Sequence, residues 1–535
     1  MKRILYKSLA YAAFLPLLTL ASCNYEEINT NPYEMTEEMG VMDGIAMGAS
    51  ITTMQRFVLP VGTQADRTDI INQYQVAYLL SADGWSGYIA EGNSWYSGLN
   101  NLQYYLQDDW VSSTYRNSYT EILSPWRKIK MECEKTGEIA PFALAQILKI
   151  SAWHKTLESF GPIPYEHAGE MALVIPFDSE KDVYVFMFND LKDAITELMS
   201  VAELGGTVVP EFDAVYAGDA AKWVKYANSL MLRLAMRLYY IDPELSKQWV
   251  SEALNHPGGV MTAADDAAQM SNGAGYVFVN NIAYCAENYG EARACTSVYA
   301  YLNGYEDPRL SAYIATSSSA DALTGYDGRK YAPVPPGAPE SHTKETYGDY
   351  SLPNLTSSSP TYWMKASEVY FLRAEAALHW SEFGDAASLY KQGIEMSFQE
   401  NGVSMDIDTY LNSGNTPVAV SIGGYSAAAP TTATPEFAGT DEQKLEKIMI
   451  QKWIAMYPNG QEAWTEWRRT GYPKLNPIDG QSADPSVTKD RGIRRMVYPQ
   501  SFRQSSEDAA NYAEAVSLLK DAEDTPTSRL WWDCR

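Results

Sequence analysis

Aromatic side chains gather in one stretch near the N-terminal end of the chain. Nine of the 37 residues from 74 to 110 are Trp or Tyr, about twice the aromatic share of 12% in the whole chain. Within this stretch, the Gly- and Asn-rich segment 81–101 disfavours a regular helix, so its rings are candidates for a binding surface. They are Trp85, Tyr88, Trp95 and Tyr96.

These residue types suit the binding of a sugar. Trp and Tyr offer flat apolar faces at low conformational cost, and Asn, Asp and Ser beside them can bind hydroxyl groups. A second candidate pair is Asn288 and Tyr289, with Arg293 nearby. The alternative for both segments is that the side chains pack the loops onto the scaffold, and the sequence leaves this open. A third candidate segment contains Tyr326, Asp327 and Tyr331.

Other chemistries find little support in the sequence. No Gly-x-Ser-x-Gly, phosphate-loop or His-Glu-x-x-His motif occurs, and the five His residues are not spaced as metal ligands. We therefore predict no catalytic residues, no metal and no cofactor. A glycosidase needs only two suitably placed carboxylates, which the 67 Asp and Glu residues leave open without singling out a pair.

The N-terminus predicts export from the cytoplasm. Three basic residues precede an apolar run at 8–20, which is too short to span a membrane and is typical of a secretory signal peptide. Leu20-Ala21-Ser22-Cys23 looks like a bacterial lipobox. The resemblance implies that residues 1–22 are removed and that Cys23 is acylated, with 23–36 as a tether. The alternative is a soluble periplasmic protein that is cut near Ser22.

Composition narrows the remaining function classes. The net charge of −26 repels phosphate groups, so we do not expect nucleic acid as a partner. The spacing of the cysteines matches no metal site, and a disulfide between Cys285 and Cys295 stays open.

Hydrophobic periodicity predicts a mainly α-helical scaffold. Apolar residues recur at helical spacing in several segments, which we group into tetratricopeptide-like helix pairs with long irregular loop insertions and a few short strands. Short strands are expected at 275–280, 419–422 and 495–499. The helix pairs are expected at roughly 141–200, 219–254, 366–399 and 441–469.

Many segments in order along the chain resemble the SusD/RagB-like nutrient-binding outer-membrane lipoproteins of Bacteroidetes. Each segment is weak alone, but together with the lipobox they form a specific pattern. The matching segments are NYEEINTNPY (24–33), ESFGPIPYEHA (158–168), FDSEKDVYVFMFNDLKDAI (177–195), YAGDAAKWVKYANSLMLRLAMRL (216–238), NGYEDPRL (303–310), MKASEVYFLRAEAALHW (364–380), LEKIMIQKWIAMYPNGQEAWTEWRRTGYPKL (445–475), RRMVYPQSF (494–502) and RLWWD (529–533).

The resemblance implies a place and a task. It implies a lipid anchor in the outer membrane, facing the cell exterior, and a single nutrient-binding domain at 37–535. It implies a SusC-like TonB-dependent transporter barrel as partner and an oligosaccharide as ligand. Peptide capture, a surface enzyme acting on glycans and a scaffold without a small ligand remain alternatives. Ligand-binding residues vary within this family, so none is carried over from it.

Overall fold

The computed structural model describes residues 45–535. The predictions for Cys23, the signal peptide and the tether therefore lie outside the described residues. Gly48 to Arg535 form one compact unit. Among the residues described, we find no helix with the length and apolar character needed to cross a membrane.

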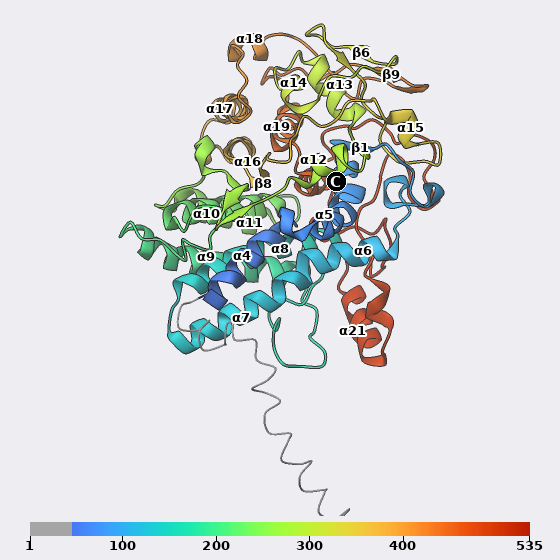
Figure 1. The fold of residues 1–535 in the computed structure, drawn as a ribbon. Coiled ribbons are helices and arrows are strands. Elements are labelled where there is room, and N and C mark those ends of the chain that lie inside the picture. The colour runs from blue at the N-terminus through green and yellow to red at the C-terminus, as the bar shows by residue number, and fades with distance from the viewer. Residues whose placement is uncertain (1–44) are drawn as a thin grey trace, which may run out of the picture. The chain divides into compact units, whose positions relative to one another are not determined.

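Four helix pairs occupy the ranges that periodicity predicts, so the mainly α-helical scaffold is confirmed. Helix α10 also packs against α9 and α16, which joins the pairs into one scaffold (Figure 1). The pairs are α8 (Ala140–Phe160) with α9 (Glu180–Ala202), α10 (Ala220–Arg237) with α11 (Pro243–Asn255), α16 (Ala366–His379) with α17 (Ala386–Glu400), and α19 (Asp441–Met456) with α20 (Gly460–Thr470).

Local sequence explains where these helices begin and how closely they pack. Side chains of Ser179, Asp219 and Asp385 accept hydrogen bonds from the first-turn amides of α9, α10 and α17, which satisfies otherwise unpaired donors. In α17, a Cβ atom at Gly393 would lie 2.8 Å from the ring of Phe371 in α16. The absence of a side chain at Gly393 thus lets α16 and α17 approach closely.

The N-terminal helices lead into the scaffold and carry the first aromatic segment. Helix η2 is of π type, and the aromatic segment follows it directly. The elements are α4 (Ile45–Val58), η1 (Gln64–Asp66), α5 (Asp69–Tyr74), η2 (Gln75–Asp83), η3 (Tyr96–Gly98), η4 (Asn101–Gln103), α6 (Asp108–Tyr115), η5 (Arg116–Thr120) and α7 (Glu121–Thr136).

The long insertions contain short helices and a C-terminal helix. These are η6 (Ala264–Asp266), α12 (Asn281–Glu287), α13 (Thr296–Gly304), α14 (Leu310–Tyr313), α15 (Lys344–Tyr347), η7 (Ser381–Phe383), α18 (Ile407–Leu411), η8 (Gln500–Arg503) and α21 (Ser506–Ser517).

Strands pair two by two and all ladders are antiparallel in the described residues. Two of the three predicted strand segments contain a strand, but 495–499 does not. There, Met496 donates its backbone N–H to Ser159 at the end of α8 instead of to a neighbouring strand. The pairs are β1 (Ile89–Glu91) with β5 (Ala292–Ala294), β2 (Ala268–Met270) with β8 (Thr361–Met364), β3 (Asn272–Gly273) with β4 (Tyr276–Val277), β6 (Leu323–Thr324) with β7 (Lys330–Tyr331), and β9 (Val420–Ile422) with β10 (Tyr425–Ala427).

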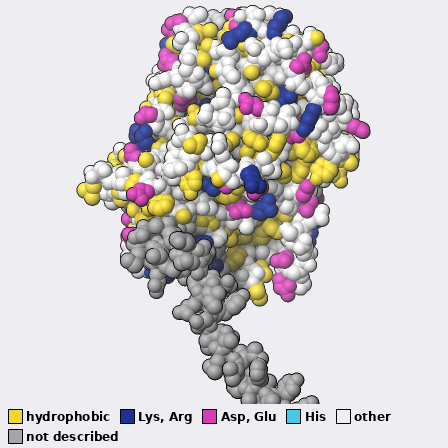
Figure 2. Space-filling view, viewed as in Figure 1, with side chains coloured by type: hydrophobic (Ala, Val, Ile, Leu, Met, Phe, Trp, Pro, Cys, Tyr) yellow, Lys and Arg dark blue, Asp and Glu magenta, His cyan; other side chains and the backbone are white. Residues whose placement is uncertain are grey.

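Charged side chains and cysteines are distributed differently in the fold. On the face shown in Figure 2, acidic and basic side chains are interspersed among apolar ones, so the acidic excess is spread out there. Cys285 and Cys295, whose pairing the sequence leaves open, are both buried and carry no disulfide. Burial raises the pKa of the Cys295 thiol to about 11, so at neutral pH this thiol stays protonated.

Candidate functional site

The β1–β5 ladder brings the two leading candidate segments together. In its register Ile89 lies opposite Ala294 and Glu91 opposite Ala292. Trp95 and Tyr96 follow β1, while Asn288 and Tyr289 precede β5, so both pairs leave the ladder at the same end. A third segment links them: Ser94 donates its backbone N–H to the carbonyl of His342, and the Lys344 ammonium donates to the carbonyl of Tyr289.

The loop after β1 presents aromatic surface to solvent. Tyr96 is 51% exposed, and its hydroxyl donates to Asp109 at 2.9 Å. The half-buried ring of Trp95 meets the buried ring of Trp110 edge-on, with their centroids 6.0 Å apart. Leu99 and Tyr105 are also exposed nearby in sequence. We call residues 95–105 the aromatic loop.

A buried amide holds the aromatic loop in shape. The side chain of Asn100 donates to the carbonyls of Trp95 and Ala338 and accepts from two backbone N–H groups. Tyr96 and Ser97 have φ angles of 49° and 51°, in the left-handed region that ordinary residues seldom adopt. The loop is therefore held by several hydrogen bonds in a defined conformation.

The second segment is partly exposed at the end of α12. Asn288 is exposed, and the half-buried Tyr289 donates its hydroxyl to Asn72 at 2.6 Å. The ring of Tyr284 meets that of Tyr289 edge-on at 5.3 Å. Asn288 and Tyr289 thus place an amide and part of a ring at the same end of the β1–β5 ladder as the aromatic loop.

Tyr88 and Trp85 need correction as surface rings. Tyr88 is fully buried, stacks on Trp453 of α19 with centroids 5.1 Å apart, and donates its hydroxyl to the Trp453 carbonyl. Trp85 is 8% exposed, packs against Trp464, and donates its indole N–H to the carbonyl of Asn101. Both rings attach the loop to the scaffold. This corrects the prediction for Tyr88, whereas Trp85 also lines a cavity and its predicted ligand contact stays a prediction.

The third candidate segment forms the β6–β7 hairpin. Tyr331 is buried, and its hydroxyl donates to Asp327 at 2.8 Å. Tyr326 is 38% exposed and donates its hydroxyl to the carbonyl of Asp307. Most of the polar groups in this segment are thus engaged within the fold.

A pair of buried carboxyl groups underlies the β1–β5 ladder. Glu91 is 2% and Glu291 4% exposed. Burial and, next, the neighbouring Glu291 raise the pKa of Glu91 well above its usual range, against the opposing charge of Arg293. Glu291 forms an ion pair with Lys344 at 2.8 Å. Burial thus disfavours the charged form of Glu91 within the ladder.

A cavity of about 500 Å³ lies beside Trp85. It is lined by Trp85, Tyr104, the half-buried Trp467 and the segment from Gly471 to Arg494. Trp453 and Trp464 are buried in the core, whereas Trp467 is half-buried at the cavity. The helical periodicity of α20 gives no sign of this, because the cavity depends on the loop that follows the helix.

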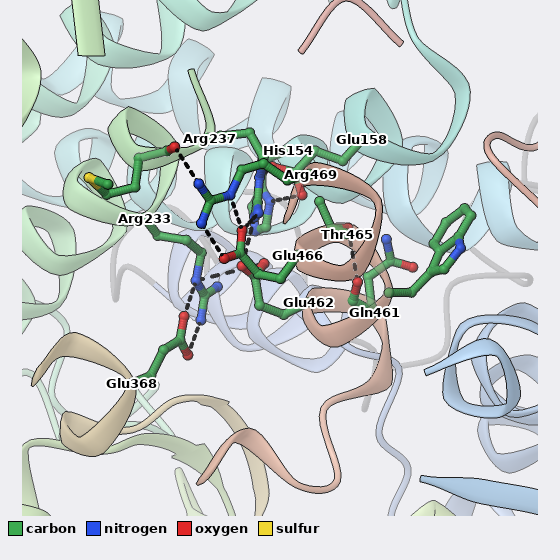
Figure 3. Close-up of polar contacts among 12 residues, drawn as sticks. His154, Glu158, Arg233, Arg237, Glu368, Gln461, Glu462, Thr465, Glu466 and Arg469 are labelled. Atoms are coloured by element: carbon green, nitrogen blue, oxygen red, sulfur yellow. Dashed lines mark hydrogen bonds and ion pairs between the residues drawn. The ribbon is translucent and has the colours of Figure 1, made fainter. Parts of the chain in front are cut away.

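The centre of the scaffold is a network of buried ion pairs rather than a metal site (Figure 3). His154, Glu158 and Glu462 offer the ligand types for a cation and lie close together. However, the Arg237 guanidinium donates to Glu158 at 3.0 Å and to Glu462 at 2.6 Å, so it already bridges both carboxylates. Burial opposes ionisation of Glu158, but Arg237 and His154 outweigh it and lower its pKa to about 2.

Further ion pairs extend the network across the helix pairs. Arg233 of α10 forms two hydrogen bonds with Glu368 of α16, and Arg469 of α20 forms two with Glu375. Glu466 also pairs with Lys452 at 2.9 Å. Removing one partner of such a buried pair typically costs about 3–5 kcal/mol, so these charges fix the mutual positions of the helices.

Comparison with known proteins agrees with this architecture. Residues 27–533 match the family model "SusD-like: Susd and RagB outer membrane lipoprotein". A chitin-binding SusD homologue from Flavobacterium johnsoniae is 32% identical, with a TM-score of 0.83 over 91% of this chain and 99% of its own. A SusD homologue from Bacteroides ovatus is 31% identical, with a TM-score of 0.82 over 92% and 100% of the two chains. No curated protein matches the chain. From its fold and the match over almost its entire length, the chain belongs to the SusD-like family.

Proposed function

We propose that this protein captures oligosaccharides at the cell surface and delivers them to a SusC-like TonB-dependent transporter without catalysis. Its family is described as one of outer membrane lipoproteins, and one similar structure is a chitin-binding homologue. The observation that carries the proposal is the exposed aromatic loop, which leaves the β1–β5 ladder at the same end as Asn288 and Tyr289. Acylated Cys23 would hold the protein in the outer membrane, beside its transporter.

The residue types at the site suit a sugar chain rather than an apolar ligand. Tyr96 and half-buried Trp95 supply ring surface, while exposed Asn288 supplies an amide for hydroxyl groups. Ring faces stack on the CH-rich face of a pyranose, and the amide fixes its orientation. The held conformation of the loop also reduces the ordering cost of binding.

The test is calorimetry of the purified protein against a panel of oligosaccharides that includes chitin fragments. We expect binding without product release, and a loss of affinity of about tenfold or more for Trp95→Ala and for Tyr96→Ala. The matched control is Tyr276→Ala, which removes a ring that is 46% exposed on β4. Its affinity should stay unchanged.

Two results would overturn the proposal. One is equal affinity of the Trp95→Ala and Tyr96→Ala variants with the original protein. The other is a lack of binding to every oligosaccharide together with binding of an extended peptide, which would favour peptide capture. Release of shortened sugars by the protein would instead identify an enzyme.

A further inference from the structure

The cavity beside Trp85 has a charge opposite to that of the whole chain. Among its 24 lining residues, six are Lys or Arg and one is acidic. At the chain's average of 41 Lys and Arg and 67 Asp and Glu in 535 residues, a lining of this size would hold about two basic and three acidic residues. The basic residues are Lys474, Lys489, Arg491, Arg494, Arg529 and Arg535.

Two carboxylates, those of Asp533 and Glu442, neutralise part of this positive charge. Arg494 forms an ion pair with Asp533, and Arg529 lies 3.9 Å from the same carboxylate. Arg535 pairs with Glu442. Two carboxylates therefore serve three guanidinium groups at this end of the cavity.

The remaining positive charges have no carboxylate partner in the part of the chain that the structure describes. The Lys474 ammonium donates to the carbonyl of Gly471 at 3.0 Å, and that of Lys489 to the carbonyl of Ile478 at 3.4 Å. For the exposed Arg491 guanidinium, no hydrogen bond or ion pair is formed with the described residues. Lys474 and Arg491 are exposed and Lys489 is half-buried, so all three are accessible to a ligand.

A buried amide in the same lining also lacks partners. Asn476 is 6% exposed, and neither its side-chain nitrogen nor its oxygen has a hydrogen-bond partner among the described residues. Its backbone N–H donates to Ser297 at 3.0 Å, which fixes its position. Leaving a buried amide unsatisfied is unfavourable, and a bound hydroxyl group would supply the missing partners.

The cavity also offers ring surface. Trp467 is half-buried, and the guanidinium carbon of Arg494 lies 5.3 Å from the centre of its ring. Trp85 and Tyr104 line the wall formed by the N-terminal segment. Rings, an unsatisfied amide and unpaired cations together match a sugar ring that carries an acidic group.

We propose that this cavity binds a sugar residue bearing a carboxylate or sulfate group, as a second subsite distinct from the ring surface of Trp95 and Tyr96. That the anion is carried on a saccharide rests on the proposed function. The inference that the cavity is positively charged depends only on its lining residues and not on that function. The protein would accordingly prefer an acidic oligosaccharide over a neutral one of the same length.

The test compares three oligosaccharides of equal length by calorimetry on the purified protein: one of uronic acids, one sulfated and one neutral. We expect at least one acidic ligand to bind more tightly than the neutral one. The double variant Lys489→Gln/Arg491→Gln should weaken the acidic ligand by about tenfold or more and leave the neutral ligand unchanged. The tighter-binding of the two acidic oligosaccharides shows whether the cavity prefers a carboxylate or a sulfate group.

The matched control is Arg127→Gln/Lys128→Gln on α7. This pair has the same half-buried and exposed pattern and the same change of charge, but it does not line the cavity. If the control weakens the acidic ligand equally, net charge explains the preference and the proposal is wrong. Equal binding of acidic and neutral ligands to the original protein would also overturn it.

Asn476→Leu provides a second variant that separates binding from folding. Replacing an unsatisfied amide with an apolar side chain of similar size should leave the melting temperature equal or higher. Affinity for the acidic ligand should fall. A variant that melts normally and binds normally would contradict a role for Asn476.

Inorganic sulfate distinguishes failure of this inference from failure of the proposed function. If no oligosaccharide binds, but sulfate raises the melting temperature of the protein and not that of Lys489→Gln/Arg491→Gln, the anion site stands and the saccharide function fails. If oligosaccharides bind without any preference for acidic groups, the saccharide function stands and the anion site fails.

Discussion

Glu180, the first residue of α9, is a buried carboxyl group without a cationic hydrogen-bond partner among the described residues. One of its oxygens accepts the backbone N–H of Trp531 at 2.9 Å, and the other has no partner there. Burial raises the pKa of Glu180 to about 8, against the hydrogen bond from Trp531 and the charges of Arg495 and Arg468. The folded protein therefore holds a proton on this group at neutral pH.

Glu180→Gln should change how stability depends on pH. Between the ordinary pKa of 4.5 and the folded pKa of about 8, the folded state binds more protons than the unfolded state, so ionisation of Glu180 costs stability as pH rises. Glutamine resembles the protonated acid and removes this cost. We expect the free energy of unfolding of the variant to exceed that of the original protein by an amount that grows from pH 5 to pH 8.

Chemical denaturation at pH 5, 6, 7 and 8 checks this expectation. The exposed Glu211→Gln serves as the control, and its difference from the original protein should stay small at every pH. A constant difference for Glu180→Gln across the series would show that the group ionises alike in both states.

Two tyrosines of one segment show what residue types alone reveal. Tyr88 and Tyr96 are eight residues apart, yet Tyr88 is fully buried and Tyr96 is 51% exposed. The sequence predicted both as candidate surface rings because both lie among Gly, Ser and Asn. What decides between them is Trp453, more than 350 residues later, and no local pattern encodes that contact. The ligand contacts of Trp95, Tyr96, Asn288 and Tyr289 stay predictions.

At the scale of elements, periodicity carried most of the information. The helix pair expected at 141–200 spans residues 140–202, and the pair expected at 366–399 spans residues 366–400. These helices contain many buried apolar residues at helical spacing, so their positions can be recognised in the sequence. Strands β1 and β5 are three residues long each, and they pair across two hundred residues, so their sequences carry no comparable signal.

Gly393→Ala tests the close packing of α16 and α17. Alanine favours a helix by about 1 kcal/mol over glycine, but its Cβ would lie 2.8 Å from the ring of Phe371. Overpacking of this kind costs about 1–3 kcal/mol, so we expect a net loss of stability of about 1 kcal/mol. Denaturant unfolding measures it. The exposed neighbour Gln392→Ala should change stability by less than about 0.5 kcal/mol, and a stabilised Gly393→Ala would refute the close contact.

At the scale of the whole molecule, the proposed lipid anchor at Cys23 determines where the protein is located, whereas other residues bind the ligand. Cys23→Ala should move the protein from the membrane fraction to the soluble fraction, because acyl chains supply about 0.8 kcal/mol per buried CH₂ group. Affinity for oligosaccharides should be unchanged, since the aromatic loop and the cavity lie within 48–535.

Fractionation of cells and calorimetry of the released protein check both parts. Ser22→Thr, a mild change at the neighbouring position, is the control and should leave the protein in the membrane fraction. Retention of Cys23→Ala in the membrane would contradict acylation at this residue and would favour attachment through a partner.

The contact between Tyr88 and Trp453 also determines when the base of the aromatic loop can finish folding. The indole N–H of Trp453 donates to the carbonyl of Ser86 at 2.9 Å, and the Tyr88 hydroxyl donates back to Trp453. Because a chain is synthesised from its N-terminus, the segment around Tyr88 exists well before α19, and contacts so distant in sequence form slowly. The base of the aromatic loop therefore packs late in folding. Until then its rings are exposed to solvent, which favours aggregation. Loss of the C-terminal helices would therefore remove the support of a binding surface that they do not themselves form.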